Sequence, residues 1–507
     1  MNSSLRVFRD LFPFSQPNAE KKAAEVRQLL GTVSGLSSYE VVVELTTHII
    51  PAIVAQPNLH MRFKLLEDAR HETEKTLPVL ERHIDSSNLP LPRAATTSAL
   101  AADNLMKALA AGYQNIAREI STGSRQKGLN RLFLRSIRRA LKLVTRRQQL
   151  AYSTYAKPSP SSWLILHDLY RMARSLCIRN PGEDISHIEY LYLSALLFAY
   201  LEPSKLPRNE LAVALFCAQQ LAPNARIAEA KAESRPNEST APAFLVRPHE
   251  GTPGIAFFRL AQDVPLGEGI IIDCTRVLET IEKTIEASAR EGAGPALDVP
   301  PGLLHTLQIG ISGKSTRRFA RKRFKPRADL VGGIAQVIPF IEGNAHSRRS
   351  ADAVGRHGNR YFVPSEWSLV DQSPDGFLVR FIQGDKWKVG VGNIVALQPR
   401  ESSHIHVCLV RRVSSDSQGH LELGLQALSA EVSVFDHPEH GETRRGICLH
   451  SLPARGGRPG VIARPGHLVS GLKLSLPQLG ETGRWQVGKR LEGSEGMEFF
   501  ALLPLPA

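Results

Sequence analysis

The chain of 507 residues has few cysteines, few aromatic residues and no long apolar run. Its five cysteines are scattered and show no C-x-x-C spacing, which argues against a disulfide framework or a zinc site and fits a reducing compartment. The longest apolar stretch, Tyr190–Leu201, is about a dozen residues, whereas a membrane-spanning helix needs roughly 20. Residues 1–22 lack the apolar core of a secretory signal. These absences predict a cytoplasmic protein without a membrane span.

The sequence also lacks a convincing set of catalytic residues, whether Ser/His/Asp, Cys/His or paired carboxylates. Residues 310–316 hint at a Walker A phosphate loop, but Gln308 stands where that motif requires its first glycine. Asp436 to His440 could chelate a metal, although a turn of solvated side chains is the favoured interpretation. We therefore predict no enzymatic activity and no metal.

The charge balance is strongly basic, with a formal net charge of +14 and a pI near 9.7. A positive surplus of this size suggests anionic partners such as nucleotides, nucleic acid or a membrane surface. With 42% hydrophobic and 22% charged residues, the composition is otherwise that of an ordinary globular protein. The length predicts about two to four domains.

Residues 1–222 are predicted to form an all-helical domain, a bundle or a degenerate α-solenoid. Apolar residues recur at intervals of three and four, and β-branched alternation is scarce. Pro78 is expected to kink or divide the third helix. The predicted helices are Ala19–Leu30, Tyr39–Val54, Leu59–Ile84, Ala94–Ile120, Gly128–Tyr155, Ser161–Ile178, His187–Leu201 and Arg208–Leu221.

The second half of the chain changes to short β-like segments. Residues 223–242 read as a flexible linker, and residues 243–315 as a small α+β module with three strands and two helices. Residues 316–435 predict a small β-barrel, with strand character over 328–341. Residues 436–507 predict a β-rich C-terminal extension that either extends the barrel or forms a separate β unit.

Two motifs in the predicted barrel could bind a ligand. Asp371, Ser373 and Gly376 form the motif D-x-S-x-x-G between two predicted strands. Because Asp371 and Ser373 are two residues apart on an extended segment, their side chains project from the same face. The glycine suits a turn that needs positive φ. Upstream, residues 317–327 hold a dense run of arginine and lysine suited to phosphates. A D-x-S-x-x-G turn alone is also common in purely structural hairpins.

Together the two motifs resemble the paired signature of the PilZ domain family, R-x-x-x-R followed by D/N-x-S-x-x-G. Residues 421–426 are similar to a late strand of that barrel, with a glycine near its centre. The resemblance implies cyclic di-GMP as ligand, with Arg317, Arg318 and Arg321 at phosphates and guanine edges, and with Asp371, Ser373 and Gly376 at a guanine. Arg323 and Arg327 give a second possible register. Between Arg321 and Asp371 the spacing of about 50 residues exceeds the family's usual 20–30, and residues 342–359 read as a surface insertion.

The whole chain resembles large proteobacterial proteins with a helical N-terminal half and an atypical PilZ domain. This resemblance implies a signalling effector that binds cyclic di-GMP and contacts a protein target, such as motility or biofilm machinery, through its helical half. The alternative is a scaffold or nucleic-acid-binding protein whose degenerate PilZ-like domain binds no nucleotide. Few aromatic residues accompany the basic run, which disfavours a platform for stacking single-stranded bases.

Overall fold

The computed structural model describes the residues in these ranges: 17–85, 89–123, 128–230, 242–260, 266–267, 269–288, 299, 301–312, 326–343, 364–384, 389–415, 420–439, 442–452, 456–479 and 483–505. The chain forms two compact units. The helical unit comprises Met1–Ser87, Leu91–Pro203 and Leu211–Ser315, and the barrel unit comprises Asn88–Pro90, Ser204–Glu210 and Thr316–Ala507.

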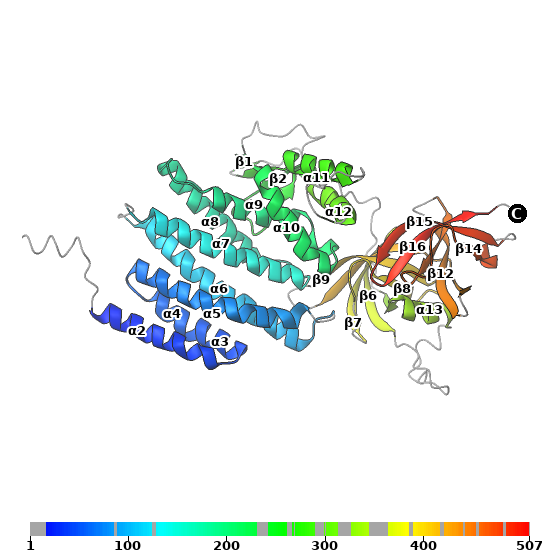
Figure 1. The fold of residues 1–507 in the computed structure, drawn as a ribbon, viewed down its shortest axis with the longest axis horizontal. Helices are drawn as coiled ribbons and strands as arrows, with labels where there is room; N and C mark the ends of the chain where they lie inside the picture. Colours follow the sequence, from blue (N-terminus) through cyan, green and yellow to red (C-terminus); the bar gives the residue numbers. More distant parts are fainter. Residues whose placement is uncertain are drawn as a thin grey trace, which may run out of the picture. The chain divides into compact units, whose positions relative to one another are not determined.

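The N-terminal half is helical, as the apolar spacing predicted. Long helices that follow one another in the sequence pack side by side, α5 on α6, α6 on α7 and α7 on α8 (Figure 1). Ser37 and Glu40 form a capping box at the start of α3. The helices are α2 (Pro17–Thr32), α3 (Ser38–Glu44), a π-helical turn (Leu45–Ile49), α4 (Ile50–Val54), α5 (Leu59–Asp85), α6 (Arg93–Thr122), α7 (Asn130–Ser153), α8 (Pro160–Arg179), α9 (Ser186–Tyr200) and α10 (Leu211–Leu221).

Helix α5 is not divided at Pro78, contrary to one of the expectations for that residue. Leu77 and Leu80 on either side are almost completely buried. A proline costs the helix one backbone hydrogen bond. Packing of the flanking leucines against the bundle outweighs that loss, so the helix continues for two more turns.

A small four-stranded sheet completes the helical unit, in the order β1-β4-β2-β3. Its elements are β1 (Arg226–Glu229), β2 (Ala243–Val246), β3 (Ile255–Ala256), β4 (Ile270–Asp273), α11 (Thr275–Ser288) and α12 (Pro301–Ser312). Strand β1 lies inside the segment predicted as a linker and pairs with β4. The ring of Phe244 stacks on that of Tyr200 at the end of α9, with centroids 3.6 Å apart. The sheet therefore packs directly on the helices.

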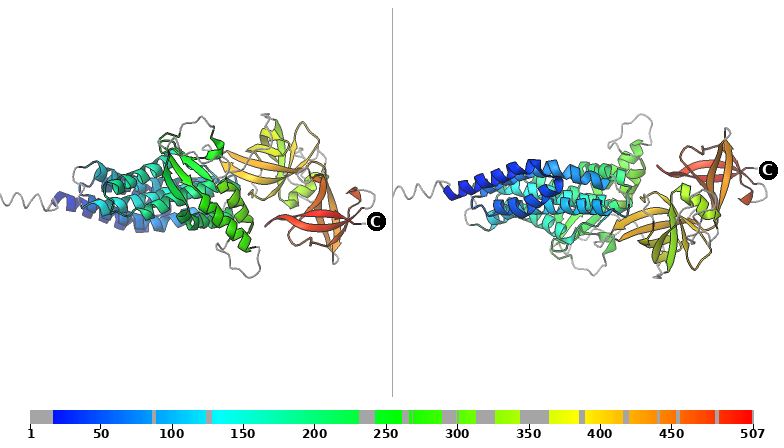
Figure 2. Two further views of the ribbon diagram at one scale, coloured as in Figure 1. Left: turned by 90° about the horizontal axis from the view of Figure 1, so that it is seen from above. Right: turned by 90° about the horizontal axis from the view of Figure 1, so that it is seen from below.

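The barrel unit begins with a closed six-stranded barrel in the order β10-β7-β6-β5-β8-β9 (Figure 2). The predicted small β-barrel is thus confirmed. Buried and less buried residues alternate in parts of β7 and β10, as in Phe377, Leu378 and Val379. The strands are β5 (Arg327–Gly332), β6 (Ser365–Ser373), β7 (Gly376–Gln383), β8 (Ile394–Pro399), β9 (His406–Ser415) and β10 (Leu421–Ser429).

The strand character expected over 328–341 is wrong for its second half, because only β5 is a strand. Helix α13 (Ile334–Glu342) follows, directly after Gly333 with φ +78°. Ile334, Val337 and Ile338 recur at helical spacing, and all three are buried. Apolar β-branched residues occur in strands and in buried helices alike, so their identity alone misled the prediction.

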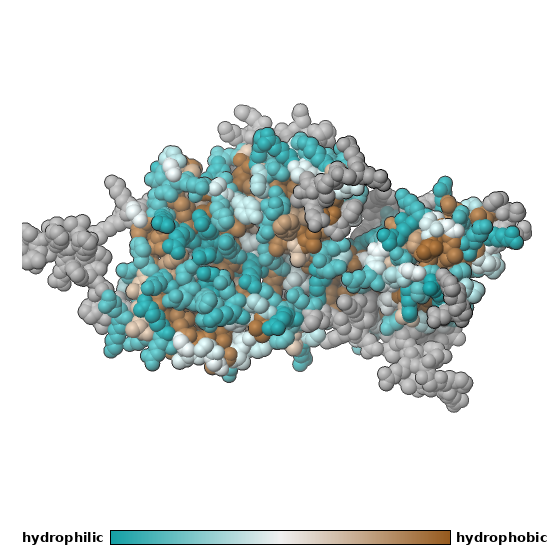
Figure 3. Space-filling view, in the orientation of Figure 1, coloured by the Kyte–Doolittle hydropathy of each residue, from teal (hydrophilic) through white to brown (hydrophobic). Residues whose placement is uncertain are grey.

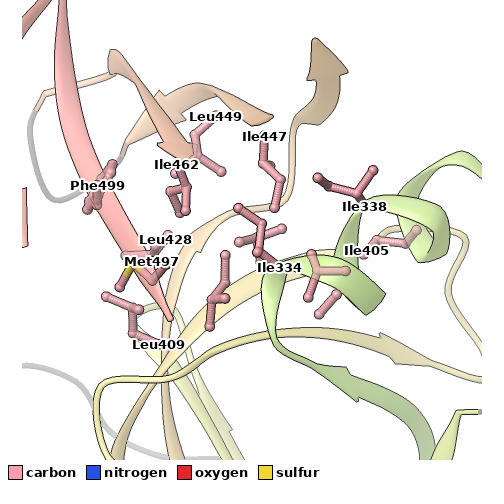
Figure 4. Close-up of a cluster of buried hydrophobic side chains, with 14 of the residues drawn as sticks. Ile334, Ile338, Ile405, Leu409, Leu428, Ile447, Leu449, Ile462, Met497 and Phe499 are labelled. Atoms are coloured by element: carbon pink, nitrogen blue, oxygen red, sulfur yellow. The ribbon is translucent and has the colours of Figure 1, made fainter. Parts of the chain in front are cut away.

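A second sheet of six strands follows the barrel, in the order β11-β12-β13-β16-β15-β14. The β-rich extension is therefore a separate sheet. Helix α13 lies in a core that includes Leu409 and Leu428 of the barrel and Ile447 and Phe499 of the sheet (Figure 4). The strands are β11 (Val432–Glu439), β12 (Glu442–Leu452), β13 (Arg458–Ala463), β14 (Lys473–Ser475), β15 (Arg484–Ser494) and β16 (Met497–Pro504).

Among the residues that the structure describes, no helix combines the length and apolar character needed to cross a membrane. The face in Figure 3 shows polar residues interspersed with smaller apolar patches.

Replacing Phe340 of α13 by alanine should lower the free energy of unfolding of the barrel unit by about 3–5 kcal/mol, because the ring is fully buried. The matched control is Ile382→Ala on the exposed side of β7, which should cost less than about 1 kcal/mol. Urea-dependent hydrogen exchange of peptides from the barrel strands measures both. Equal effects of the two changes would contradict the place of α13 in the core.

Candidate ligand-binding site

The D-x-S-x-x-G motif forms the tight hairpin between β6 and β7. Ser373 pairs with Gly376, so Pro374 and Asp375 alone make the turn. The register is continuous from Asp371 to Ser373, and both residues are half-buried while Gln372 between them is exposed. The predicted placement of Asp371 and Ser373 on one face therefore agrees with the strand pairing.

A register shift before Asp371 determines which face that is. Leu369 pairs with the buried Val379, but Asp371 pairs with the outward-facing Leu378. A bulge inserts one extra residue and so reverses the side on which the following residues emerge. Without the shift, Asp371 would lie opposite Phe377, which faces the barrel interior. The bulge thus places Asp371 on the outer face of the barrel.

Gly376 is required chiefly by a close contact between strands. A Cβ atom at this position would lie 1.9 Å from the carbonyl oxygen of Leu425 in β10. Its φ of +157° is positive but close to extended. The conformation of the turn therefore contributes less to the need for glycine than the contact with Leu425 does. The Ser373 hydroxyl donates to the Gly376 carbonyl at 3.4 Å, a long hydrogen bond that leaves its oxygen able to accept others.

A row of directly paired residues extends from Asp371 across the outer face. Asp371 pairs with Leu378 of β7, and Leu378 pairs with Gly424 of β10. Neighbouring strands lie about 4.8 Å apart, so the row from Asp371 to Gly424 covers about 10 Å. Gly424 contributes no side chain to this row. In the adjoining row, Arg380 donates to Glu422 at 2.6 and 3.0 Å.

The basic run reaches the barrel next to the same strand. Arg317, Arg318, Arg321 and Arg323 lie outside the described residues, and the description resumes at Pro326. The Pro326 carbonyl accepts a hydrogen bond from the Leu369 amide at 3.0 Å. Arg321 precedes Pro326 by five residues, a chain length of at most about 18 Å. The hydrogen bond thus fixes Pro326, near the end of the basic run, to Leu369, which lies two residues before Asp371.

Arg327, part of the alternative register, is engaged within the barrel. It forms an ion pair with Glu366, which also contacts Arg400 at 3.2 Å and accepts from Gln383 at 2.7 Å. Desolvation alone would raise the pKa of Glu366, but the hydrogen bonds from Gln383 and Arg327 and the nearby arginine charges lower it below its usual value. A ligand would have to compete with this ionised carboxylate for Arg327.

The described structure lends no support to the two weaker sequence candidates. Gly310 lies in helix α12, and the rest of the Walker-like segment from residue 313 is outside the described residues. Asp436 belongs to strand β11 rather than a turn and pairs with Arg445 at 3.0 Å. Among the described residues, no three potential metal-ligating side chains cluster together.

Gly376→Ala should lower the stability of the barrel unit by at least about 3 kcal/mol, the upper end of the usual cost of overpacking, because its Cβ would overlap the Leu425 carbonyl. Gly390→Ala is the matched control, since the nearest atom to its Cβ, Asn393 Oδ1, lies at 3.4 Å. Urea denaturation of both proteins compares them. A stable Gly376→Ala protein would show that the β7–β10 contact is not tight.

The family that matches this chain covers most of its helical half. Residues 24–232 match the family described as cyclic-di-GMP receptor FimW, N-terminal domain. The cyclic-di-GMP receptor FimW of Pseudomonas aeruginosa is 24% identical over 322 residues, which is 60% of this chain and 50% of that protein. The chain thus spans about half the length of the curated relative that it matches, and no solved structure matches. Through α2 to β1, the chain is similar to the N-terminal domain of a cyclic-di-GMP receptor.

Proposed function

We propose that the chain is a non-enzymatic signalling effector that binds cyclic di-GMP through a PilZ-like barrel and contacts a protein target through its helical part. One observation carries the proposal. The hydrogen bond between Leu369 and Pro326 brings the end of the basic run to the strand that presents Asp371, in a closed six-stranded barrel. Both halves of the PilZ signature can therefore reach one ligand.

The chemistry of these groups suits a guanine nucleotide. The Asp371 carboxylate can accept from the N1–H and N2–H donors of guanine, with the Ser373 hydroxyl beside it. Arg317, Arg318 and Arg321 offer planar guanidinium groups that bind phosphate or the guanine O6/N7 edge in a bidentate manner. We favour Arg317 and Arg321 over Arg323 and Arg327, because Arg327 already pairs with Glu366.

The long spacing between the motifs is compatible with this proposal. The residues from 334 to 342 that lengthen it fold as α13, whose buried side belongs to the shared core. The sequence predicted a surface insertion over residues 342–359, and residues 344–359 lie outside the described residues. Because β5 and β6 pair directly on either side of this segment, its length does not separate Pro326 from Leu369.

The similarity of the helical half to a receptor's N-terminal domain supports the same ligand. We assign the ligand to the barrel (316–435) and contact with a partner in the cytoplasm to the helical domain (1–222), followed by 223–242 and the 243–315 module. Residues 436–507 serve as the extension that completes the barrel's core. That the protein partner belongs to the motility or biofilm machinery is implied by the resemblance to proteins with a PilZ domain.

Arg321→Ala should weaken cyclic di-GMP binding by about 1.5–3 kcal/mol, the range for a hydrogen bond to a charged group. Isothermal titration calorimetry measures the loss, and Arg323→Ala in the same run serves as the register control. The reverse ranking of the two variants would move the role to the second register. A wild-type protein that binds no cyclic di-GMP but binds RNA or DNA would support the scaffold alternative instead.

Asp371→Ala should reduce the affinity roughly tenfold or more, because two guanine donors lose their acceptor, while Gly376 still permits the hairpin. Asp375→Ala is the matched control, since it removes an exposed carboxylate from the same turn. Calorimetric titration and thermal unfolding are performed on both proteins. A loss of about 0.5–1.5 kcal/mol in stability with unchanged affinity would make Asp371 a brace of its own turn.

A further inference from the structure

Arg412 of β9 continues the row that starts at Asp371. Gly424 pairs on one side with Leu378 and on the other with Arg412, so the row crosses four adjacent strands, β6, β7, β10 and β9. Directly paired residues project from the same face of a sheet. Arg412 therefore shares the outer face of the barrel with Asp371, about 14 Å away across three strand spacings.

The guanidinium of Arg412 lacks a partner within the described chain. Its Nε is buried and forms no hydrogen bond, and neither of its terminal nitrogens takes part in an ion pair with a described residue. Ser414 is the next residue of β9 on this face, opposite Glu422; it is 7% exposed, and its hydroxyl is likewise buried without a hydrogen bond. Buried donors that remain unpaired are costly and call for an explanation.

The acceptors around Arg412 are already occupied by other arginines. Glu422 accepts both of its hydrogen bonds from Arg380. Arg411, the preceding residue, donates to Gln426 at 2.7 Å and forms an ion pair with Glu492. Arg380 and Arg411 are thus paired with carboxylates of the barrel unit, whereas the guanidinium of Arg412 is paired with no described carboxylate.

Gly424 adds no side chain to the row between Asp371 and Arg412. A Cβ atom at this position would lie 3.2 Å from the Cβ of Arg412, so a larger side chain would crowd the arginine and cover the row. Leu378 provides an apolar surface on the other side of the glycine. A flat ring can rest on these two residues while its edges meet polar groups at either end.

We propose that Arg412 is a further ligand-binding residue whose guanidinium holds the O6/N7 edge of a guanine in a cyclic dinucleotide bound at Asp371. This inference rests on the proposed function and adds a specificity determinant to it. The arginine fork matches the two acceptors O6 and N7. Adenine presents an amino donor in place of O6, so Arg412 selects cyclic di-GMP over cyclic di-AMP.

Calorimetric titrations of Arg412→Ala, Arg412→Lys and wild type with cyclic di-GMP and with cyclic di-AMP test the assignment. We expect Arg412→Ala to bind cyclic di-GMP at least tenfold more weakly and to lose most of its preference over cyclic di-AMP. Lysine, which lacks the fork, should not restore that preference. Arg411→Ala is the matched control: it removes an equal charge from the same strand and should leave the preference unchanged. Thermal unfolding should show Arg412→Ala to be as stable as wild type, because no internal partner is lost.

The outcomes separate this inference from the function on which it rests. If Arg412→Ala retains wild-type affinity and preference while Asp371→Ala loses binding, the assignment of Arg412 is wrong and the proposed function stands. If wild type binds neither dinucleotide, both are wrong. Gly424→Val gives a second variant that keeps Arg412 in the sequence but crowds its side chain and covers the row. It should also weaken binding, and unchanged binding would contradict the proposed surface.

Discussion

The close approach of β10 to Gly376 is the contact on which the arrangement of the barrel's outer face depends. With the Leu425 carbonyl 1.9 Å from where a Cβ would lie, only glycine allows β7 and β10 to pair at this point. That pairing fixes which residue of β10 lies beside Leu378. Together with the bulge before Asp371, it aligns Asp371, Leu378 and Gly424 in one row. A shift of one residue between β6 and β7 would turn Asp371 to the opposite face, and a shift between β7 and β10 would replace Gly424 beside Leu378.

Much of this architecture could be predicted from periodicity, and the remainder depends on contacts between segments far apart in the sequence. The helices before residue 222 and the barrel strands followed from their apolar spacing. Helix α13 was mistaken for a strand because Ile334, Val337 and Ile338 are β-branched, although their spacing of three and four is helical. The motif residues Asp371, Ser373 and Gly376 were recognisable, but the reason for Gly376 lies in β10, about 50 residues away. Arg412 carries no local signal at all, since only strand pairing brings it into the row.

Several of the chain's arginines take part in internal ion pairs, although such pairs leave the formal net charge of +14 unchanged. In the helical unit, Arg139 and Arg146 of α7 pair with Glu67 and Glu81 of α5, and the buried Arg147 pairs with Asp103 of α6. These pairs join α7 to both α5 and α6. An arginine without such a partner, like Arg412, is accordingly a better indicator of a binding site than net charge is.

Hydrogen exchange measured by mass spectrometry, with and without cyclic di-GMP, tests most directly whether the barrel holds the ligand. The barrel assignment predicts that added ligand slows exchange in peptides covering residues 317–327 and 369–378, and in those covering 409–412 and 421–426. Peptides from residues 24–232, the part similar to a receptor's N-terminal domain, should change less. Protection confined to residues 24–232, with the barrel peptides unchanged, would contradict the account and place the ligand in the helical unit.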